Sequence, residues 1–223
     1  MLTLAIDTST NILSLALVQA STVLACLDKR ALNNQSAILM SRIEELLKAK
    51  DFGATDLTRI SVAIGPGSYT GIRVGVAAAK SLGYALSIPV AGVSSLAVMA
   101  RASGVDTGII APMIDARRGT VFAGAYDGTG NVLVSDGHYD LDEFLLQLAV
   151  FSDKVTFVGD AVTLYQEKIL KQTENVLVLA ESGFSRSKAE ALAELASNGS
   201  SQKNIHALVP NYLRKTEAEL NLE

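Results

Sequence analysis

Two stretches of this sequence share one plan: LAIDTSTNILSLALV, residues 4–18, and PMIDARRGTVFAGAYD, residues 112–127. Each is an apolar segment that ends in Ile-Asp, followed by a short polar turn and by a segment alternating small and apolar residues. This pattern is typical of a β-hairpin. Asp7 and Asp115 occupy equivalent positions in the two stretches. Because helix-like and strand-like segments follow both of them, the sequence predicts an α/β fold with a duplicated topology.

Around these hairpins, segments with the periodicity of a strand alternate with segments that have the periodicity of a helix. The first half predicts three strands before residue 28, a helix from about Gln35 to Lys50, a strand over 60–65, a helix to about Leu86, a strand over 88–93 and a helix capped by Ser94 or Ser95. The second half predicts strands over 131–140, 155–160 and 175–180, each followed by a helix: 141–150, 161–171 and 187–197. The polar stretch at 101–108 divides the chain into a lobe of residues 1–102, a lobe of residues 103–205 and a segment 206–223 that we expect to return to the first lobe.

Composition places the chain among globular proteins. Of its 223 residues, 49% are hydrophobic and 19% are charged, and the net charge of −4 argues against a free-standing nucleic-acid binder. Two readings stay open for Arg117 and Arg118: solvated surface side chains, or a local RNA contact within a larger complex. With Cys26 as the only cysteine, no internal disulfide can form, and we expect this residue in the core. No long apolar run and no signal peptide are visible, so we expect a cytoplasmic protein.

The glycine-rich loop GPGSYTGIRVG, residues 65–75, lies between a strand and a helix. It lacks the lysine and the spacing of a Walker phosphate loop, and it does not fit G-x-G-x-x-G. A weak anion site at the helix N-terminus remains open. The alternative is a turn at Pro66-Gly67 with Thr70 as the N-cap.

The helix behind this loop carries small residues at every fourth position: Gly71, Gly75, Ala79 and Gly83. Glycine inside a helix costs up to ~1 kcal/mol relative to alanine, so close packing against another backbone is the expected compensation. That backbone belongs either to this protein's own sheet or to a helix of a partner.

The polar groups at the strand ends give weaker signals. Asp7 and Asp115 are candidate ligands of a metal or of a phosphate-bound water, but each can equally accept hydrogen bonds from turn amides. His138 and His206 are far apart in the sequence, so the chain shows no His/Cys metal cluster and no set of residues for self-contained catalysis.

Five segments, taken in order, resemble the bacterial TsaB (YeaZ) family: AIDTST at 5–10, GPGSYTGIRVG at 65–75, GVSSLAVMA at 92–100, IDARRGTVFAGAYD at 114–127 and PNYLR at 210–214. The resemblance covers essentially the whole chain. It implies the actin-like, Hsp70-like ATPase (ASKHA) fold with two similar mixed-sheet lobes. It also implies a part in forming N6-threonylcarbamoyladenosine at position 37 of tRNAs that read ANN codons.

The same resemblance implies a non-catalytic role beside TsaD, the transferase subunit. TsaD has a metal-binding histidine pair on its first helix, and the corresponding helix here, from Gln35, has none. The implied partners are TsaD as a heterodimer, TsaE, tRNA only within the complex, and a second copy of this chain when TsaD is absent, with no membrane. No cofactor of its own is implied, since ATP or ADP and metal are expected on TsaD and TsaE. Many relatives have histidine followed by serine or threonine where this chain reads Asn34-Gln35-Ser36.

The first two helices are the implied contact with TsaD, which favours the partner reading of the small residues. The implied interface comprises Gln35, Leu39, Met40, Ile43, Gly71, Ile72, Val74, Gly75, Ala78, Ala79, Leu82 and Gly83. On this reading, Gly75→Leu leaves the fold largely intact and abolishes the association. A weaker set next to a nucleotide comprises Asp7, Thr8, Ser9, Asp115 and Arg117.

Two other functions stay open. A small kinase of the same fold would use Asp7 and Asp115 around a magnesium nucleotide. It would also need a late glycine-rich adenosine loop, for which residues 176–195 offer only Gly183. A self-associating module is the third hypothesis, since a face built for a paralogue can also bind its own copy.

Overall fold

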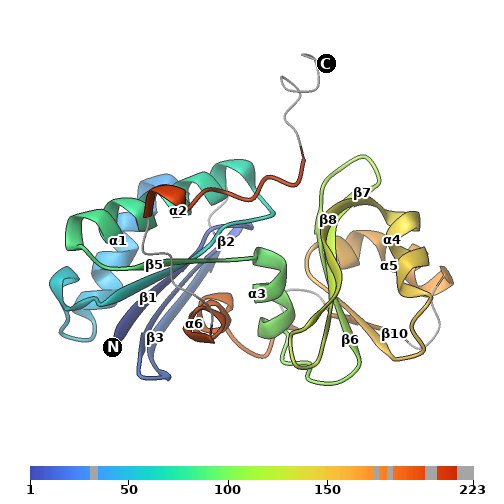
Figure 1. Ribbon diagram of the computed structural model, residues 1–223, viewed down its shortest axis with the longest axis horizontal. Helices are drawn as coiled ribbons and strands as arrows, with labels where there is room; N and C mark the ends of the chain where they lie inside the picture. The colour runs from blue at the N-terminus through green and yellow to red at the C-terminus, as the bar shows by residue number, and fades with distance from the viewer. Residues whose placement is uncertain (31–34, 173–175, 180–182, 199–204, 215–223) are drawn as a thin grey trace, which may run out of the picture.

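The computed structural model describes residues 1–30, 35–172, 176–179, 183–198 and 205–214. Two lobes lie side by side, each built on a five-stranded mixed sheet (Figure 1). The elements of the first half are β1 Leu2–Asp7, β2 Ile12–Gln19, β3 Thr22–Arg30, α1 Gln35–Lys48, η1 Ala54–Asp56, β4 Arg59–Ala63, α2 Tyr69–Leu86, β5 Val90–Val93 and α3 Ser95–Ala102. Those of the second are β6 Ile109–Asp115, β7 Thr120–Asp127, β8 Val132–Asp140, α4 Leu141–Leu148, β9 Val155–Val158, α5 Ala161–Gln172, β10 Val176–Leu179, α6 Lys188–Asn198 and η3 Ile205–Ala207.

The predicted duplication is confirmed by the order of the strands. The first sheet runs β3-β2-β1-β4-β5, and the second, read from its other edge, runs β8-β7-β6-β9-β10. In each sheet the first strand of the repeat pairs antiparallel with the second and parallel with the fourth. Asp7 and Asp115 are the last residues of β1 and β6.

Alternation along β1 divides the core of the first lobe into two layers. Leu4 and Ile6 pack against α1 and α2 on one face of the sheet. Ala5 points to the opposite face, where it joins Ala16 and Ala63 under α6. Because three small side chains line this face, α6 packs closely against the strands.

The last helix of each half makes contacts beyond its own half of the chain. Leu96 and Met99 of α3 pack against the second sheet, and α6 lies across the first sheet, as Figure 1 shows. The predicted lobe of residues 103–205 includes α6. The structure places it on the first lobe, because its apolar face, with Leu192, covers the alanine-lined face of β1, β2 and β4.

The last described residues run from the first lobe to the second. Leu208 is buried in the core under α2, and Asn211 donates its backbone N–H to the Ile64 carbonyl at 2.7 Å. Arg214 then reaches across and donates to the Ala116 carbonyl at 3.1 Å.

A second connection between the lobes centres on Asp136 of β8. Its Oδ1 accepts a hydrogen bond from the Tyr126 hydroxyl at 2.5 Å, and its Oδ2 accepts one from the Ser94 hydroxyl. Ser94 is also the N-cap of α3, so the predicted cap is confirmed. One carboxylate therefore ties the start of α3 to the second sheet.

The prediction that Cys26 belongs to the core is wrong. β3 is an edge strand, and Cys26 is exposed on it. Within the described ranges, no helix has the length and apolar character that would let it cross a bilayer.

Candidate functional site in the cleft between the lobes

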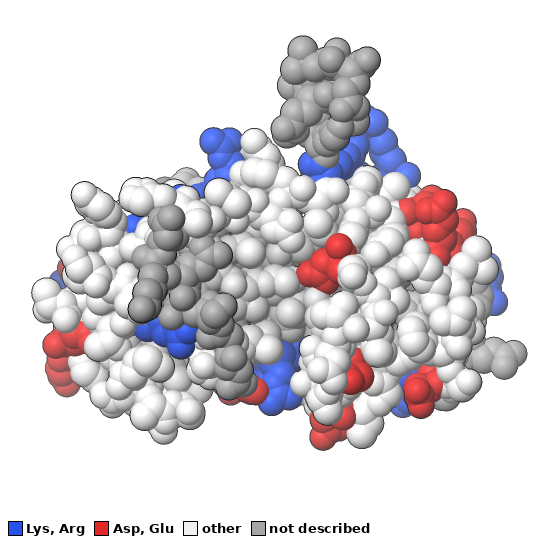
Figure 2. Space-filling model, viewed as in Figure 1, with Lys and Arg blue, Asp and Glu red and all other residues white. Residues whose placement is uncertain are grey.

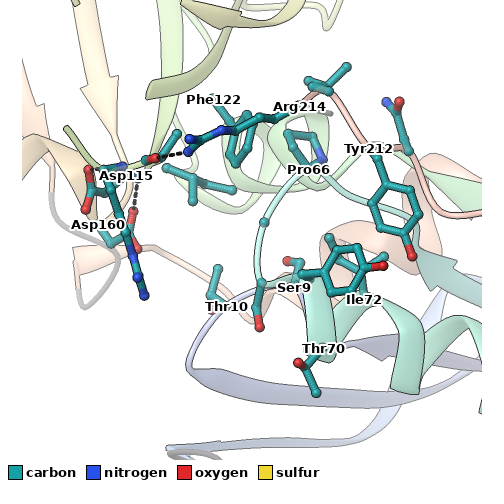
Figure 3. Close-up of a pocket in the computed structure, with 18 of the residues that line it drawn as sticks. Ser9, Thr10, Pro66, Thr70, Ile72, Asp115, Phe122, Asp160, Tyr212 and Arg214 are labelled. Carbon is teal, nitrogen blue, oxygen red and sulfur yellow. Dashed lines mark hydrogen bonds between the residues drawn. The ribbon is translucent and has the colours of Figure 1, made fainter. Parts of the chain in front are cut away.

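A cleft of about 700 Å³ lies between the turns that follow β1 and β6 (Figure 3). One wall carries Ser9 and Thr10, and the facing wall carries Asp115 and Asp160. The glycine-rich loop 66–70 and the C-terminal residues 211–214 complete the lining. Three of the five residues expected next to a nucleotide line this cleft: Ser9, Asp115 and Arg117. Asp7 and Thr8 are fully buried and are not among its lining residues.

The glycine-rich loop is held by the β1–β2 turn. Ser68 donates its backbone N–H to the Ser9 carbonyl at 2.7 Å. Gly67 has φ +147°, and a Cβ there would overlap the same carbonyl. The N-cap of α2 is Ser68, whose hydroxyl accepts from the Gly71 N–H at 3.2 Å, so the prediction of Thr70 is wrong. Ser68 lies two residues before Thr70, and its side chain is the one that reaches the free amides of the first turn.

The small residues of α2 pack against this protein's own sheet. Thr8 donates its hydroxyl to the Gly71 carbonyl at 2.7 Å, and a Cβ at either Gly71 or Gly75 would overlap atoms of Thr8. A Cβ at Gly83 would overlap the Val90 side chain. The interpretation of these residues as a partner contact is therefore corrected: the helix needs them because β1 and β5 lie so close beneath it.

Several other residues of the implied interface are also buried within the chain. They are Gln35, Leu39, Ile43, Ile72 and Ala79. The members that reach the surface are Met40, which is 50% exposed, and the partly exposed Val74, Ala78 and Leu82. Only this second group is available for contact with another protein.

Gln35 has a structural role in this chain. Its Nε2 donates to the Thr10 carbonyl at 2.6 Å, which ties the first residue of α1 to the β1–β2 turn. The neighbouring Asn34 lies outside the described residues.

Asp7 accepts hydrogen bonds from its own turn, as the alternative reading predicted. Its Oδ1 accepts from the Ser9 N–H at 2.8 Å and from the Ser9 hydroxyl at 2.6 Å. Its Oδ2 accepts no hydrogen bond from the described residues and lies 3.9 Å from Nζ of Lys188. Lys188 is only 3% exposed and donates to the Thr10 hydroxyl at 2.6 Å. Sequence reasoning missed Lys188, because it lies 181 positions after Asp7 in the chain and nothing local marks it as buried.

Asp115 has the equivalent turn role in the second lobe. Its Oδ1 accepts from the Arg117 N–H at 3.0 Å and from the Tyr165 hydroxyl at 3.2 Å. Burial, followed by the nearby Asp115 charge, raises the pKa of Tyr165. Arg117 and Arg118 have φ of 68° and 55°, so the turn holds both in the left-handed region at the edge of the cleft.

Asp7 does not fit a divalent metal, because a cation of the chain already faces its carboxylate. Magnesium takes about six oxygen ligands in near-octahedral geometry, and usually only one or two of them are carboxylates, the others being waters or phosphates. Among the residues that the structure describes, no three His, Cys, Asp or Glu side chains are grouped to hold one ion. Asp7 already faces an ammonium group, and two unit charges about 4 Å apart interact by about 4 kcal/mol at an effective dielectric constant near 20. A metal beside Asp7 would experience repulsion of this order from Lys188.

Aromatic and basic side chains stand at the opening of the cleft. The rings of Tyr69 and Tyr212 lie 5.0 Å apart between centroids, and the Arg73 guanidinium lies 5.2 Å from the centre of the Tyr69 ring. Figure 2 shows basic side chains at the upper edge of the face in view and also along its lower edge, with acidic ones in separate groups. Flat rings and a positive charge thus lie together at the opening, while Asp115 and Asp160 stand on the wall that faces Ser9 and Thr10.

Comparison with known proteins gives consistent results. The profile of the family described as TsaD, tRNA N6-adenosine threonylcarbamoyltransferase, matches residues 29–222. The tRNA threonylcarbamoyladenosine biosynthesis protein TsaB of Bacillus subtilis is 38% identical over 97% of this chain and 95% of its own length. The structure of YeaZ from Pseudomonas aeruginosa is similar with a TM-score of 0.79, at 24% identity over 95% of this chain and 99% of that one.

A more distant structure bears on the fold alone. The activator of the 2-hydroxyisocaproyl-CoA dehydratase from Clostridium difficile, solved with bound ADPNP, is similar with a TM-score of 0.52. It is 11% identical, and the match covers 89% of this chain and 95% of that one. The expected actin-like ATPase fold, with two mixed-sheet lobes, is confirmed. With a relative 38% identical along nearly its full length, this chain belongs to the TsaB (YeaZ) family.

Proposed function

We propose that this chain is the non-catalytic partner of a TsaD-type transferase in forming N6-threonylcarbamoyladenosine at position 37 of tRNAs that read ANN codons. In this role it is a scaffold that binds TsaD and helps to recruit TsaE and, within the complex, tRNA. The observation that carries the proposal is the match to Bacillus subtilis TsaB, which spans nearly the whole of both proteins.

The geometry of the cleft supports a non-catalytic role. Asp7 is held by Ser9 and faces Lys188, and Asp115 is held by its own turn and by Tyr165. Helix α1 carries no histidine of the kind that binds metal in TsaD. We therefore assign ATP or ADP and the metal to TsaD and TsaE, and no cofactor to this chain.

The surface proposed to contact TsaD is the exposed side of α1 and α2, defined by Met40, Val74, Ala78 and Leu82. Both helices cover the same face of the first sheet. Met40 is one of the exposed large apolar side chains of the molecule, and Val74, Ala78 and Leu82 of α2 are partly exposed. Apolar and methionine side chains are typical of the buried centre of an interface. In the absence of TsaD, we propose that two copies of this chain associate through the same surface.

The test is co-purification with the TsaD-type protein of the same organism. Size-exclusion chromatography of the mixture is expected to give a new peak that contains both chains. Two separate peaks at micromolar concentrations would contradict the proposal.

The cleft itself favours one second candidate, a small ATP-dependent kinase. Its volume of about 700 Å³ is within the range of small-molecule sites, and a protein of the same fold was solved with bound ADPNP. The two functions differ in what the isolated chain does. Magnesium-dependent ATP turnover by the purified chain, lost in Asp115→Asn, would favour the kinase. The scaffold proposal predicts none.

Localisation follows from the proposed pathway. Since the proposed substrate is tRNA, we propose that the protein acts in the cytoplasm. Fractionation of cells that produce the tagged protein tests this, and recovery mainly with membranes would contradict it.

A further inference from the structure

A buried ion pair joins the two halves of the chain behind the cleft. Asp7, at the end of β1, is fully buried, and Lys188, the first residue of α6, is 3% exposed. Their Oδ2 and Nζ atoms lie 3.9 Å apart. Oδ2 accepts no hydrogen bond from the described residues, so Lys188 is its neutralising group there.

The position of Lys188 follows from the path of α6. This helix comes from the second half but lies across the first sheet, on the face that carries Ala5 and Asp7. Ser187, just before the helix, accepts a hydrogen bond from the Ala189 N–H at 3.2 Å, which fixes the first turn. The lysine is thereby directed at the β1–β2 turn, where Thr10 accepts its hydrogen bond at 2.6 Å.

A charged lysine is rarely buried without a specific partner. Asp7 ends a strand next to a cleft, which is where open α/β sheets bind ligands and where a carboxylate can hold a divalent ion. A metal ion beside Oδ2 would have to share the place with the ammonium group. The two cations exclude each other by charge.

We infer that the ammonium group of Lys188 is a tethered cation that stands in for a divalent metal at Asp7 and prevents one from binding there. The cation is part of the chain and cannot be lost by chelation or dilution. It fastens α6 to the β1–β2 turn and leaves the carboxylate neutralised. This inference goes beyond the scaffold role and gives a physical reason why Asp7 does not hold a metal ion.

The experiment is a titration with Mn²⁺ followed by electron paramagnetic resonance, since Mn²⁺ binds to the same oxygen ligands as Mg²⁺. Lys188→Ala and Lys188→Gln remove the ammonium group, and the glutamine variant keeps a hydrogen-bond donor for Thr10. Lys168→Ala is the matched control, because Lys168 pairs with Asp142 at 2.8 Å on the surface. Circular dichroism verifies that each variant is folded.

Both Lys188 variants are expected to bind one Mn²⁺ at least about tenfold more tightly than the wild type, because a repelling charge has been removed. Adding Asp7→Asn is expected to abolish this gain, and Lys168→Ala is expected to behave as the wild type. Folded Lys188 variants that bind Mn²⁺ no better than the wild type would overturn the inference.

The wild-type titration decides the question even where a variant does not fold. A wild-type Mn²⁺ site that disappears in Asp7→Asn contradicts the inference, and the absence of such a site supports it. The outcome is independent of the scaffold proposal, which is tested by TsaD binding and tRNA modification. Either idea can therefore fail without the other.

Discussion

The hydroxyl of Thr8 donates to the Gly71 carbonyl at 2.7 Å and occupies the space that a side chain at Gly75 would need. One turn of α2 thus rests directly on the end of β1. The same contact explains why α2 tolerates glycines in its interior, which by themselves weaken a helix.

Gly75→Leu is expected to destabilise the isolated protein by about 2 kcal/mol or more, because its side chain would overlap Thr8 and crowd Val62. Urea unfolding followed by circular dichroism measures the change. Ala77→Leu is the control, since Ala77 is exposed on the same helix and its change should stay within about 0.5 kcal/mol. Equal stability of the Gly75 variant and the wild type would refute the packing account. The contact between Gly75 and Thr8 therefore argues against the expectation that this variant keeps its fold and loses only its partner.

Met40→Asp is expected to weaken binding of the TsaD-type partner by about 2 kcal/mol, or about thirtyfold, because it places a charge in an apolar contact. Met40 is 50% exposed, so the stability of the isolated chain should change little. Isothermal titration calorimetry measures the affinity. Leu146→Asp, at a 71% exposed position on α4 of the other lobe, should bind as the wild type does. If Met40→Asp also bound normally, this surface would not be the interface.

The sequence predicts those features of the fold and of the candidate site that depend on residues close together in the chain. The strands, the helices and the duplication follow from local periodicity and from the repeated Ile-Asp hairpin, and the structure confirms them. The small-residue spacing of α2 correctly predicted a close backbone contact. It did not reveal which backbone, because the approach of Thr8 depends on the tertiary fold.

The features that the sequence does not predict depend on contacts between residues far apart in the chain, or on the place of a strand at the edge of its sheet. Lys188 reaches Asp7 only because α6 crosses to the first sheet, which no local pattern encodes. Cys26 has the alternation of a buried strand, but β3 has a neighbour on one side only. The N-cap at Ser68 rather than Thr70 is a smaller error of the same origin, since the loop path is set by Ser9.

Cys26 provides a prediction on pH. Burial of its thiol, and then the charges of Glu190 and Asp28, raises the pKa of Cys26 from 9.0 to about 11, although the residue lies on an exposed edge strand. Alkylation by iodoacetamide should therefore be slow at pH 8 and should accelerate with pH up to about 11.

The urea-unfolded chain is the control for this measurement, and there the thiol should titrate near its ordinary pKa. Because the unfolded state loses this proton first, the Cys26 contribution lowers stability as pH rises between 9.0 and about 11. A native alkylation profile with a midpoint near 9.0 would show that the surroundings of Cys26 have no such effect.

Asp136→Ala is expected to destabilise the protein by about 1–3 kcal/mol, because the Tyr126 and Ser94 hydroxyls lose a shared charged acceptor. Thermal unfolding measures the loss. Asp153→Ala removes an exposed carboxylate from the same lobe and should leave the melting temperature almost unchanged. Similar melting temperatures for both variants would mean that Asp136 does not fasten the lobes together.

The most direct test of the scaffold role is formation of threonylcarbamoyladenosine on unmodified tRNA in vitro. Purified TsaC, which supplies the threonylcarbamoyl-AMP, is combined with TsaD and TsaE, with and without this chain, and the modified nucleoside is measured by mass spectrometry. We predict that modification requires this chain and that Met40→Asp reduces it while Leu146→Asp does not. Full modification in the absence of the chain would contradict the account.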